Sequence, residues 1–159
     1  MRKTYKDFVK ELLPFIKEIF PWDLKEKIQK SPPGSVLLLD IREPYEFDLM
    51  KIENSINVPR GILEAACDYD YEETVPQLVE ARETDIVIIC RSGNRSVLAA
   101  NTLLQMGYKS VVSLKTGLRG WNDSEESLVD SKGRKVSQEE ADEYFNRLPD
   151  EEKRSPRHS

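Results

Sequence analysis

Two kinds of hydrophobic pattern alternate along this chain. Short segments rich in branched apolar residues predict β-strands at residues 36–39, 55–58, 86–89 and 110–114. Around them, apolar residues recur at helical spacing, which predicts helices at residues 5–20, 24–30, 44–48, 96–106 and 137–147. Two further helical patterns fall within residues 61–81 and are interrupted around Cys67. Strands that alternate with helices predict an α/β fold, in which a mostly parallel sheet is covered by helices on both faces.

The length of 159 residues suits one domain with additions at both ends. We expect the domain to cover residues 22–123, preceded at residues 1–21 by an amphipathic helix. The apolar stripe of that helix is expected to pack on the domain or to contact a partner. Residues 124–159 are more polar, and we expect them to form a helical extension, opened by a capping box at Ser137, and a disordered tail from Pro149.

Charge and composition exclude several classes of function. The formal net charge is −5, with 24 basic and 29 acidic residues, so we expect no nucleic-acid partner. No apolar run approaches the length of about 20 residues that spans a bilayer, so no membrane partner is expected. Charged residues interrupt the first 20 positions, which argues against a signal peptide. With only two cysteines, a disulfide framework is not indicated, and we expect a cytoplasmic protein.

One segment carries the pattern of a chemical site. The apolar strand at residues 86–89 ends at Cys90, and a helical pattern begins at Ser96 after a short polar loop. Backbone N–H groups of such a loop, together with the helix dipole, stabilise a thiolate, as do Arg91 and Arg95. The alternative is a buried core thiol, which is the usual state of a cysteine at the end of a strand. Two arginines are poor neighbours for an inert thiol, so we favour a reactive, anion-binding cysteine.

The positions of other polar residues narrow the mechanism. Asp40 and Cys90 each follow a predicted strand, and α/β proteins bind ligands at that edge of the sheet. The single histidine, His158, is the penultimate residue, so neither a Cys–His pair nor a zinc site is expected. Cys67 lies in an apolar helical context, and we expect a core residue there more than a second reactive thiol. Electrostatic activation of Cys90 is the mechanism that remains.

Four motifs follow one another in register, at residues 38–47, 52–59, 90–96 and 115–121. Their sequences are LLDIREPYEF, IENSINVP, CRSGNRS and KTGLRGW. Together they resemble the rhodanese family of sulfurtransferases, and the resemblance covers roughly residues 22–123. It implies a rhodanese-like α/β fold with a five-stranded, mostly parallel sheet.

The resemblance also implies roles for individual residues. Cys90 is the expected nucleophile, and Arg91 and Arg95 are expected to attract the anionic donor. The expected substrate-binding residues are Arg91, Ser92, Gly93, Asn94, Arg95 and Ser96. The residues expected to brace the loop by ion pairing are Asp40, Arg42 and Glu43. We further expect Arg91 to steer the donor and Arg95 to hold the loop through Asp40 or Glu43. No metal and no cofactor is implied.

The implied reaction moves a sulfane sulfur from thiosulfate, or from a persulfide donor, through a Cys90 persulfide to cyanide or a thiol acceptor. Two alternatives remain open. The first is a non-catalytic persulfide carrier or interaction module with the same fold, which would serve a sulfur-relay protein partner. The second is a phosphatase, which the loop length disfavours, because Cys90 to Arg95 spans six residues and related phosphatases use one more.

Overall fold

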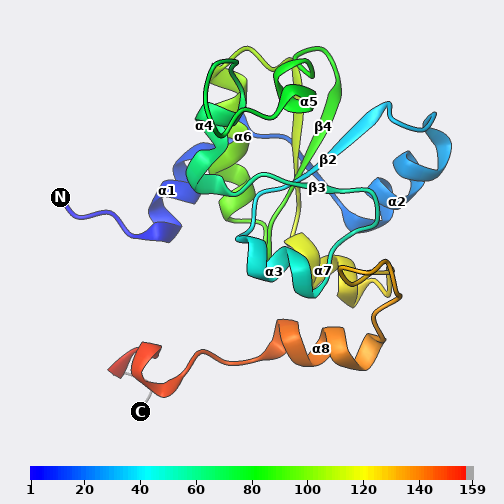
Figure 1. The fold of residues 1–159 in the computed structure, drawn as a ribbon. Helices are drawn as coiled ribbons and strands as arrows, with labels where there is room; N and C mark the ends of the chain where they lie inside the picture. Colours follow the sequence, from blue (N-terminus) through cyan, green and yellow to red (C-terminus); the bar gives the residue numbers. More distant parts are fainter. Residues whose placement is uncertain (157–159) are drawn as a thin grey trace.

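The centre of the molecule is a parallel β-sheet in the computed structural model, which describes residues 1–156 (Figure 1). Its strands lie in the order β1 (Glu18–Ile19), β5 (Ser110–Leu114), β4 (Asp85–Ile89), β2 (Val36–Asp40) and β3 (Ile56–Asn57). Every neighbouring pair is parallel. The prediction of an α/β fold with a five-stranded parallel sheet is therefore confirmed, and β4, which leads to Cys90, lies in the middle.

Helices cover both faces of this sheet (Figure 1). One face carries α1 (Tyr5–Leu12), α4 (Leu63–Ala66), α5 (Pro76–Val79) and α6 (Arg95–Gln105). The other face carries α2 (Pro21–Lys30), α7 (Gly117–Asp123) and α8 (Gln138–Asn146). The remaining elements are α3 (Pro44–Leu49), which follows β2, and the 3-10 turns η1 (Leu13–Phe15), η2 (Arg60–Ile62) and η3 (Glu151–Lys153). The two layers of helices bury the sheet between them.

The strands β2 and β4 each contain a run of four consecutive apolar residues, 36–39 and 86–89, because both of their faces are buried. In β2, Leu37 and Leu39 belong to the core under α6, whereas Leu38 belongs to the core under α7. In β4, Ile88 and Ile89 divide between the two cores in the same way. Successive side chains of a strand point to opposite faces, so a continuous apolar run is the pattern that a doubly covered strand requires.

The N-terminal segment differs from the predicted helix over residues 5–20. The helix ends at Leu12, because Pro14 follows in the 3-10 turn η1 and cannot donate the next helical hydrogen bond. The chain then extends, and Glu18–Ile19 pairs with β5 as the edge strand β1. The next helix, α2, begins at Pro21, three residues before the predicted start, because proline suits the first helical turn.

The first helix packs on the domain through one side. Its N-terminus is closed by a capping box, in which Thr4 Oγ1 accepts from Asp7 N at 3.2 Å and Asp7 Oδ2 accepts from Thr4 N at 2.8 Å. Val9 is buried in the core shared with α6, whereas Phe8 is half exposed. The N-terminus of α1 lies toward the same end of the molecule as α3 (Figure 1).

The C-terminal extension runs from α7 through α8 to the described end of the chain. Ser137 Oγ accepts from Glu140 N at 3.1 Å and so begins α8, as the sequence predicted. Ala141 and Phe145 fix the helix to the core beside α7. The segment expected to be a disordered tail contains the turn η3, and the single histidine of the sequence, His158, lies outside the described residues. No helix within residues 1–156 is long and apolar enough to cross a bilayer.

Candidate active site

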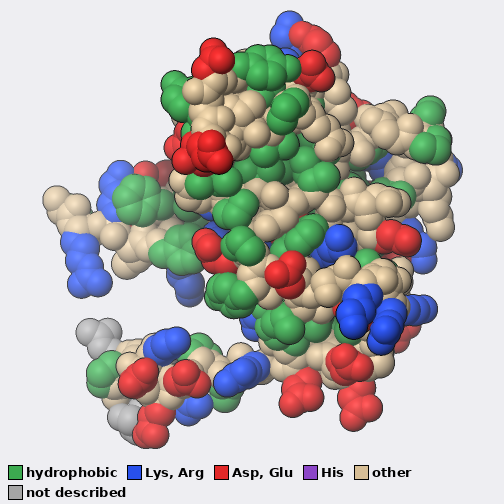
Figure 2. Space-filling view, viewed as in Figure 1, with side chains coloured by type: hydrophobic (Ala, Val, Ile, Leu, Met, Phe, Trp, Pro, Cys, Tyr) green, Lys and Arg blue, Asp and Glu red, His purple; other side chains and the backbone are tan. Residues whose placement is uncertain are grey.

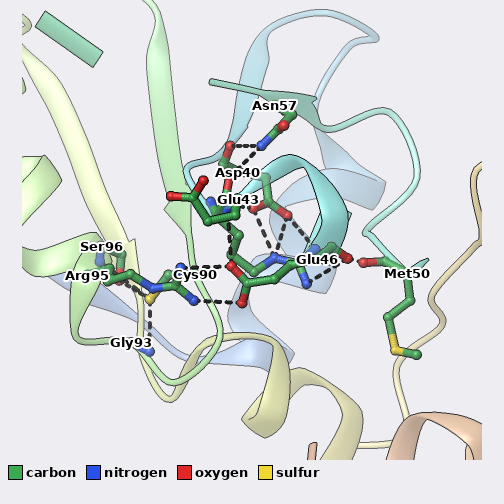
Figure 3. Close-up of polar contacts among 10 residues, drawn as sticks. Asp40, Glu43, Glu46, Met50, Asn57, Cys90, Gly93, Arg95 and Ser96 are labelled. Atoms are coloured by element: carbon green, nitrogen blue, oxygen red, sulfur yellow. Dashed lines mark hydrogen bonds and ion pairs between the residues drawn. The ribbon is translucent and has the colours of Figure 1, made fainter. Parts of the chain in front are cut away.

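Cys90 directly follows β4 and begins the loop that leads into α6 (Figure 3). Its side chain is almost fully buried, with 1% exposure. Cys90 Sγ accepts a hydrogen bond from Gly93 N at 3.1 Å and another from Ser96 N at 3.4 Å. The second donor lies in the first turn of α6, so the helix dipole adds to the field of both N–H groups. This arrangement stabilises negative charge on the sulfur.

Two buried serine hydroxyls complete the surroundings of the sulfur. The thiol donates to Ser96 Oγ at 3.2 Å, and Ser96 Oγ shares a 2.7 Å hydrogen bond with Ser113 Oγ on β5. Both serines are fully buried. When Cys90 is ionised, Ser113 can donate to Ser96 Oγ, which frees the Ser96 proton for the sulfur. Ser113 is not among the residues predicted from the sequence, although a serine inside an apolar strand is a signal of a buried polar contact.

Two glycines allow the loop to lie directly against the turn that follows β5. Gly93 has φ of +86°, and a Cβ there would lie 2.8 Å from Thr116 N. Gly117 has φ of +60°, and its Cβ would lie 2.6 Å from the carbonyl of Arg91. The first turn of α7 adds two backbone hydrogen bonds, from Leu118 N to Cys90 O at 2.9 Å and from Arg119 N to Arg91 O at 3.0 Å. The motif at residues 115–121 therefore holds the loop from outside.

Arg95 ties the other side of the loop to α3 (Figure 3). Its Nη1 and Nη2 donate to Glu46 Oε2 and Oε1, each at 2.9 Å, and Glu43 N donates to Glu46 Oε2 at 2.9 Å. Burial by itself would raise the pKa of Glu46, but these hydrogen bonds and the charges of Arg95 and Arg42 outweigh burial and lower the pKa. The hydrogen bonds to Glu46 likewise raise the pKa of Arg95.

The prediction that Arg95 pairs with Asp40 or Glu43 is therefore wrong, because its partner is Glu46. Asp40 is already occupied by Arg42, whose Nε and Nη2 donate to it at 3.0 Å and 2.8 Å. Glu43 is exposed at the start of α3 and contributes its backbone N–H. Glu46 was missed because an acidic residue in the first turn of a helix is also the pattern of ordinary capping.

The fully buried Asp40–Arg42 pair supports the helix that carries Glu46. Arg42 Nη2 also donates to Met50 O at 2.7 Å, and Nη1 donates to Glu46 O at 3.3 Å. One guanidinium therefore joins the end of β2 to the end of α3. In this geometry Asp40 and Arg42 position Glu46, and Glu46 in turn positions Arg95.

Arg91 reaches a different element. Its Nη2 donates to Tyr144 O at 2.9 Å, and its guanidinium lies over the Tyr144 ring at 4.8 Å from the centroid. The residue that follows Cys90 is thereby joined to α8, in the C-terminal extension. Ser92 and Asn94 are exposed on the outer side of the loop. The steering of a donor by Arg91 stays a prediction.

The N-terminal helix also reaches the neighbourhood of the loop. Tyr5, the first residue of α1, has its pKa raised by burial and by the nearby charge of Cys90, whereas Arg95 lowers it. The Tyr5 hydroxyl therefore lies within electrostatic range of Cys90 and Arg95. No motif in the sequence indicated this proximity, because Tyr5 lies outside the stretch that resembles a known family.

Cys67 lies apart from this loop. It is a free, fully buried cysteine in the core under α6, and burial raises the pKa of its thiol. Among residues 1–156, no group of three or more histidine, cysteine or acidic side chains is arranged to hold a metal ion. Within this part of the chain, Cys90 is the thiol placed for anion chemistry.

Fold and site together define a class of protein: an α/β domain whose central strand delivers a buried cysteine into a loop of N–H donors. A family model, the rhodanese-like domain, matches residues 21–124. The chain belongs to this rhodanese-like family of sulfurtransferases.

Relatives of known name agree with this assignment. A Schizosaccharomyces pombe protein named "Putative thiosulfate sulfurtransferase, mitochondrial" is 34% identical over 110 residues, which cover 66% of this chain and 78% of the relative. The adenylyltransferase and sulfurtransferase MOCS3 of Drosophila persimilis is 34% identical over 125 residues, 78% of this chain. The match spans only 26% of that second relative, so the chain corresponds to about a quarter of its length.

Solved structures show the same fold. A Rhodopseudomonas palustris protein of unknown function, described as a "Possible Tyrosine Phosphatase", aligns with a TM-score of 0.68 and 30% identity over 79% of this chain and 94% of that chain. Thiosulfate sulfurtransferase from Pseudomonas aeruginosa aligns with a TM-score of 0.65 over 89% of this chain and 26% of that chain. Its sequence identity is 19%, so this second similarity shows the fold alone.

Proposed function

We propose that this protein transfers a sulfane sulfur through a persulfide on Cys90, with thiosulfate as a donor. The observation that carries the proposal is the pair of N–H donors to Cys90 Sγ, Gly93 N at 3.1 Å and Ser96 N at 3.4 Å. The Ser96 hydroxyl lies beside them and accepts from the thiol at 3.2 Å. A persulfide extends the same side chain by one sulfur and keeps the negative charge beside these donors. Membership of the family and the name of the S. pombe relative support the same chemistry.

The first half-reaction loads the cysteine. The Cys90 thiolate attacks the outer sulfur of thiosulfate, a Sγ–S bond forms, and the S–S bond of thiosulfate breaks. Sulfite leaves with the bonding electron pair and a charge of −2, and the Cys90 persulfide keeps a charge of −1. Charge and electrons balance without any added oxidant or reductant.

The second half-reaction removes the transferred sulfur from Cys90. Cyanide or a thiolate attacks the terminal sulfur of the persulfide, and the Sγ–S bond breaks. The products are thiocyanate or a new persulfide, together with the regenerated Cys90 thiolate. The N–H groups of Gly93 and Ser96 stabilise the negative charge that returns to Sγ as the Sγ–S bond breaks, and so lower the barrier of this step.

Loop residues divide this work. The proposed substrate-binding residues are Arg91, Ser92, Gly93, Asn94, Arg95 and Ser96. Arg91 and Arg95 place positive charge beside the loop and attract a dianionic donor, although the protein as a whole is negative. Arg95 has a second task, because its bidentate contact with Glu46 holds the loop in shape.

A second candidate is a persulfide carrier that exchanges sulfur with a protein partner and turns over thiosulfate poorly. The observation in its favour is a relative from Bacillus subtilis named "Putative sulfur carrier protein YrkF", which is 32% identical over 112 residues, 70% of this chain and 54% of that protein. The same Cys90 loop serves both roles, so kinetics decides between them.

The test is mass spectrometry of the intact protein after incubation with thiosulfate. We expect one added sulfur atom in the wild type and in Cys67→Ser, and none in Cys90→Ser. Cys67→Ser is the matched control, since it removes the other thiol. Loss of the adduct in folded Cys67→Ser would contradict a mechanism with one thiol.

Steady-state assays then separate the candidates. Rapid production of thiocyanate from thiosulfate and cyanide supports the enzyme. A stable adduct with slow release supports the carrier. Hydrolysis of p-nitrophenyl phosphate without any sulfur adduct would overturn both and favour phosphatase chemistry.

We propose that the protein works in a reducing compartment and place it in the cytoplasm. Both cysteines are free and buried, as intracellular thiols commonly are. The S. pombe relative is named as mitochondrial, so fractionation of cells that express a tagged full chain should include the mitochondrial fraction.

A further inference from the structure

A cavity of about 510 Å³ opens beside the active-site loop, between α3 and the segment that follows α8. The active-site side supplies Arg91 and Glu46, α8 supplies Tyr144, and the C-terminal segment after α8 supplies Arg147 and Lys153. Figure 2 shows this C-terminal segment standing off the body of the molecule, with basic and acidic side chains on it. A volume of this size suits a small organic ligand and exceeds what thiosulfate alone would fill.

The charges around the cavity favour an anion. Glu46 is neutralised by the two hydrogen bonds from Arg95, and Asp150 lies 4.0 Å from Lys153 in an exposed pair. Arg91 and Arg147 have no carboxylate partner within residues 1–156. Two guanidinium groups that lack carboxylates therefore face one cavity in a protein of net charge −5. Guanidinium groups match the geometry of carboxylates, which they bind through two parallel hydrogen bonds.

The walls between these charges are aromatic and apolar. Tyr45 and Tyr144 line the cavity together with Leu148. Tyr144 also stacks against the Arg91 guanidinium, which fixes both groups. Such a lining accommodates a carbon skeleton between carboxylates better than it accommodates a bare inorganic ion.

We propose that this cavity binds the carboxylates of a low-molecular-weight organic thiol that accepts sulfur from Cys90. The proposal rests on the sulfur transfer proposed above and names its acceptor class. The bound thiolate attacks the terminal sulfur of the Cys90 persulfide; its S–S bond forms as the Sγ–S bond breaks. The organic persulfide leaves with one negative charge on its terminal sulfur, in addition to the charges of its carboxylates, and Cys90 returns to the thiolate.

The residues that select this acceptor lie mainly outside the family domain. Tyr144, Arg147 and Lys153 follow residue 124, where the family match ends. The C-terminal extension therefore has a functional role in this proposal, because it forms one wall of the acceptor site. Arg91 connects that wall to the nucleophile through its contact with Tyr144 O.

The experiment compares two acceptor thiols with thiosulfate as the donor: mercaptosuccinate, which carries two carboxylates, and uncharged 2-mercaptoethanol. The readout is the ratio of their kcat/KM values, in which differences in loading of Cys90 cancel. We expect Arg147→Gln/Lys153→Gln to lower this ratio about tenfold, mainly through KM for mercaptosuccinate, as the loss of two exposed ion pairs would do. The matched control is Lys132→Gln/Arg134→Gln, which removes two exposed cations of the same extension away from the cavity and should leave the ratio unchanged.

An unchanged ratio in Arg147→Gln/Lys153→Gln, or an equal fall in both double variants, would overturn the proposal. A persulfide donor with the same carboxylates could occupy the same cavity. A second experiment therefore uses mercaptosuccinate persulfide as the donor and cyanide as the acceptor. If the rate saturates with mercaptosuccinate persulfide as the donor but not with mercaptosuccinate as the acceptor, the cavity binds the donor, and the acceptor proposal is wrong.

A binding measurement keeps this inference separate from the proposed function. Calorimetric titration of Cys90→Ser with mercaptosuccinate requires no chemistry. We expect saturable binding that weakens about tenfold when Arg147→Gln/Lys153→Gln is added. Failure to bind would overturn the cavity proposal even if sulfur transfer occurs. A wild-type protein that transfers sulfur to no acceptor would instead contradict the proposed function.

Discussion

Arg95 and Glu46 form a bidentate ion pair, with both N–O distances at 2.9 Å, across 49 residues of sequence. Arg95 is the first residue of α6, and the next residue, Ser96, donates its N–H to Cys90 Sγ, whereas Glu46 belongs to α3. The ion pair therefore fixes the loop that contains Cys90 relative to α3, which follows β2, and it does so without contacting Cys90 Sγ. The contribution of this ion pair to the free energy of unfolding depends on its burial: the side chain of Glu46 is 7% exposed and that of Arg95 is 30% exposed.

Removal of Arg95 should destabilise the protein. In Arg95→Ala, the buried carboxylate of Glu46 loses its partner, and we expect the free energy of unfolding to fall by about 2 kcal/mol, below the range for fully buried pairs because Arg95 is partly solvated. The melting temperature should fall by about 4–8 °C for a chain of this length. Differential scanning calorimetry measures both.

The control for that variant is Arg60→Ala. Arg60 pairs with Glu64 at 3.3 Å and has a similar exposure of 32%, but Glu64 is 60% exposed. We expect a loss below about 1 kcal/mol. Equal losses in the two variants would show that burial of Glu46 contributes nothing.

The same pair should make stability depend on pH in the acidic range. The pKa of Glu46 in the folded protein lies below its ordinary value of 4.5, because the hydrogen bonds from Arg95 and Glu43 outweigh burial. The resulting stabilisation is complete above pH 4.5 and is lost as the pH falls through the folded pKa. Urea unfolding at a series of pH values should show a steeper acidic loss in the wild type than in Glu46→Gln. Exposed Glu64→Gln should follow the wild type.

Gly93 and Gly117 should tolerate no side chain. Alanine at either position combines a positive φ with a Cβ within 2.8 Å of backbone atoms, so the loop must move. Gly107 provides the comparison, since it has φ of +90° and open space around it. Gly107→Ala should cost about 1 kcal/mol, and the other two variants about 1–3 kcal/mol more, with loss of sulfur transfer. Thermal unfolding and the thiocyanate assay measure the two effects.

Cys67 should be chemically silent in the folded protein. It is fully buried, and burial raises the pKa of its thiol. In Cys90→Ser, which leaves Cys67 as the one thiol, Ellman's reagent should detect no thiol under native conditions and one in urea. Rapid native labelling of folded Cys90→Ser would contradict the placement of Cys67 in the core.

Sequence patterns predicted the central strands because burial on both faces demands continuous apolar runs. The pattern did not predict the edge strand β1, because this strand contains only two residues, one of them the charged Glu18, and depends on pairing with β5. Only the family resemblance implied a fifth strand. Helical periodicity over residues 5–20 was also misleading, because Pro14 ends the pattern in a turn.

Local sequence order predicted the immediate surroundings of Cys90. A strand, a cysteine, a short loop and a helix suffice to bring Ser96 N to the sulfur. The contacts that hold the loop from outside could not be found in this way, because Glu46 and Tyr144 are distant in sequence and resemble ordinary helix residues. Their partners depend on how α3 and α8 pack.

The contact between Arg91 and Tyr144 links residues 53 positions apart and has a consequence for the synthesis of the chain. During synthesis, β1 has no partner until β5 has been made, and Arg91 has no partner on α8 until Tyr144 has been made. Contacts of such long range form late in folding. The loop that holds Cys90 thus takes its final shape only after α8 has been synthesised, so a shorter nascent chain carries Cys90 without its complete set of supports.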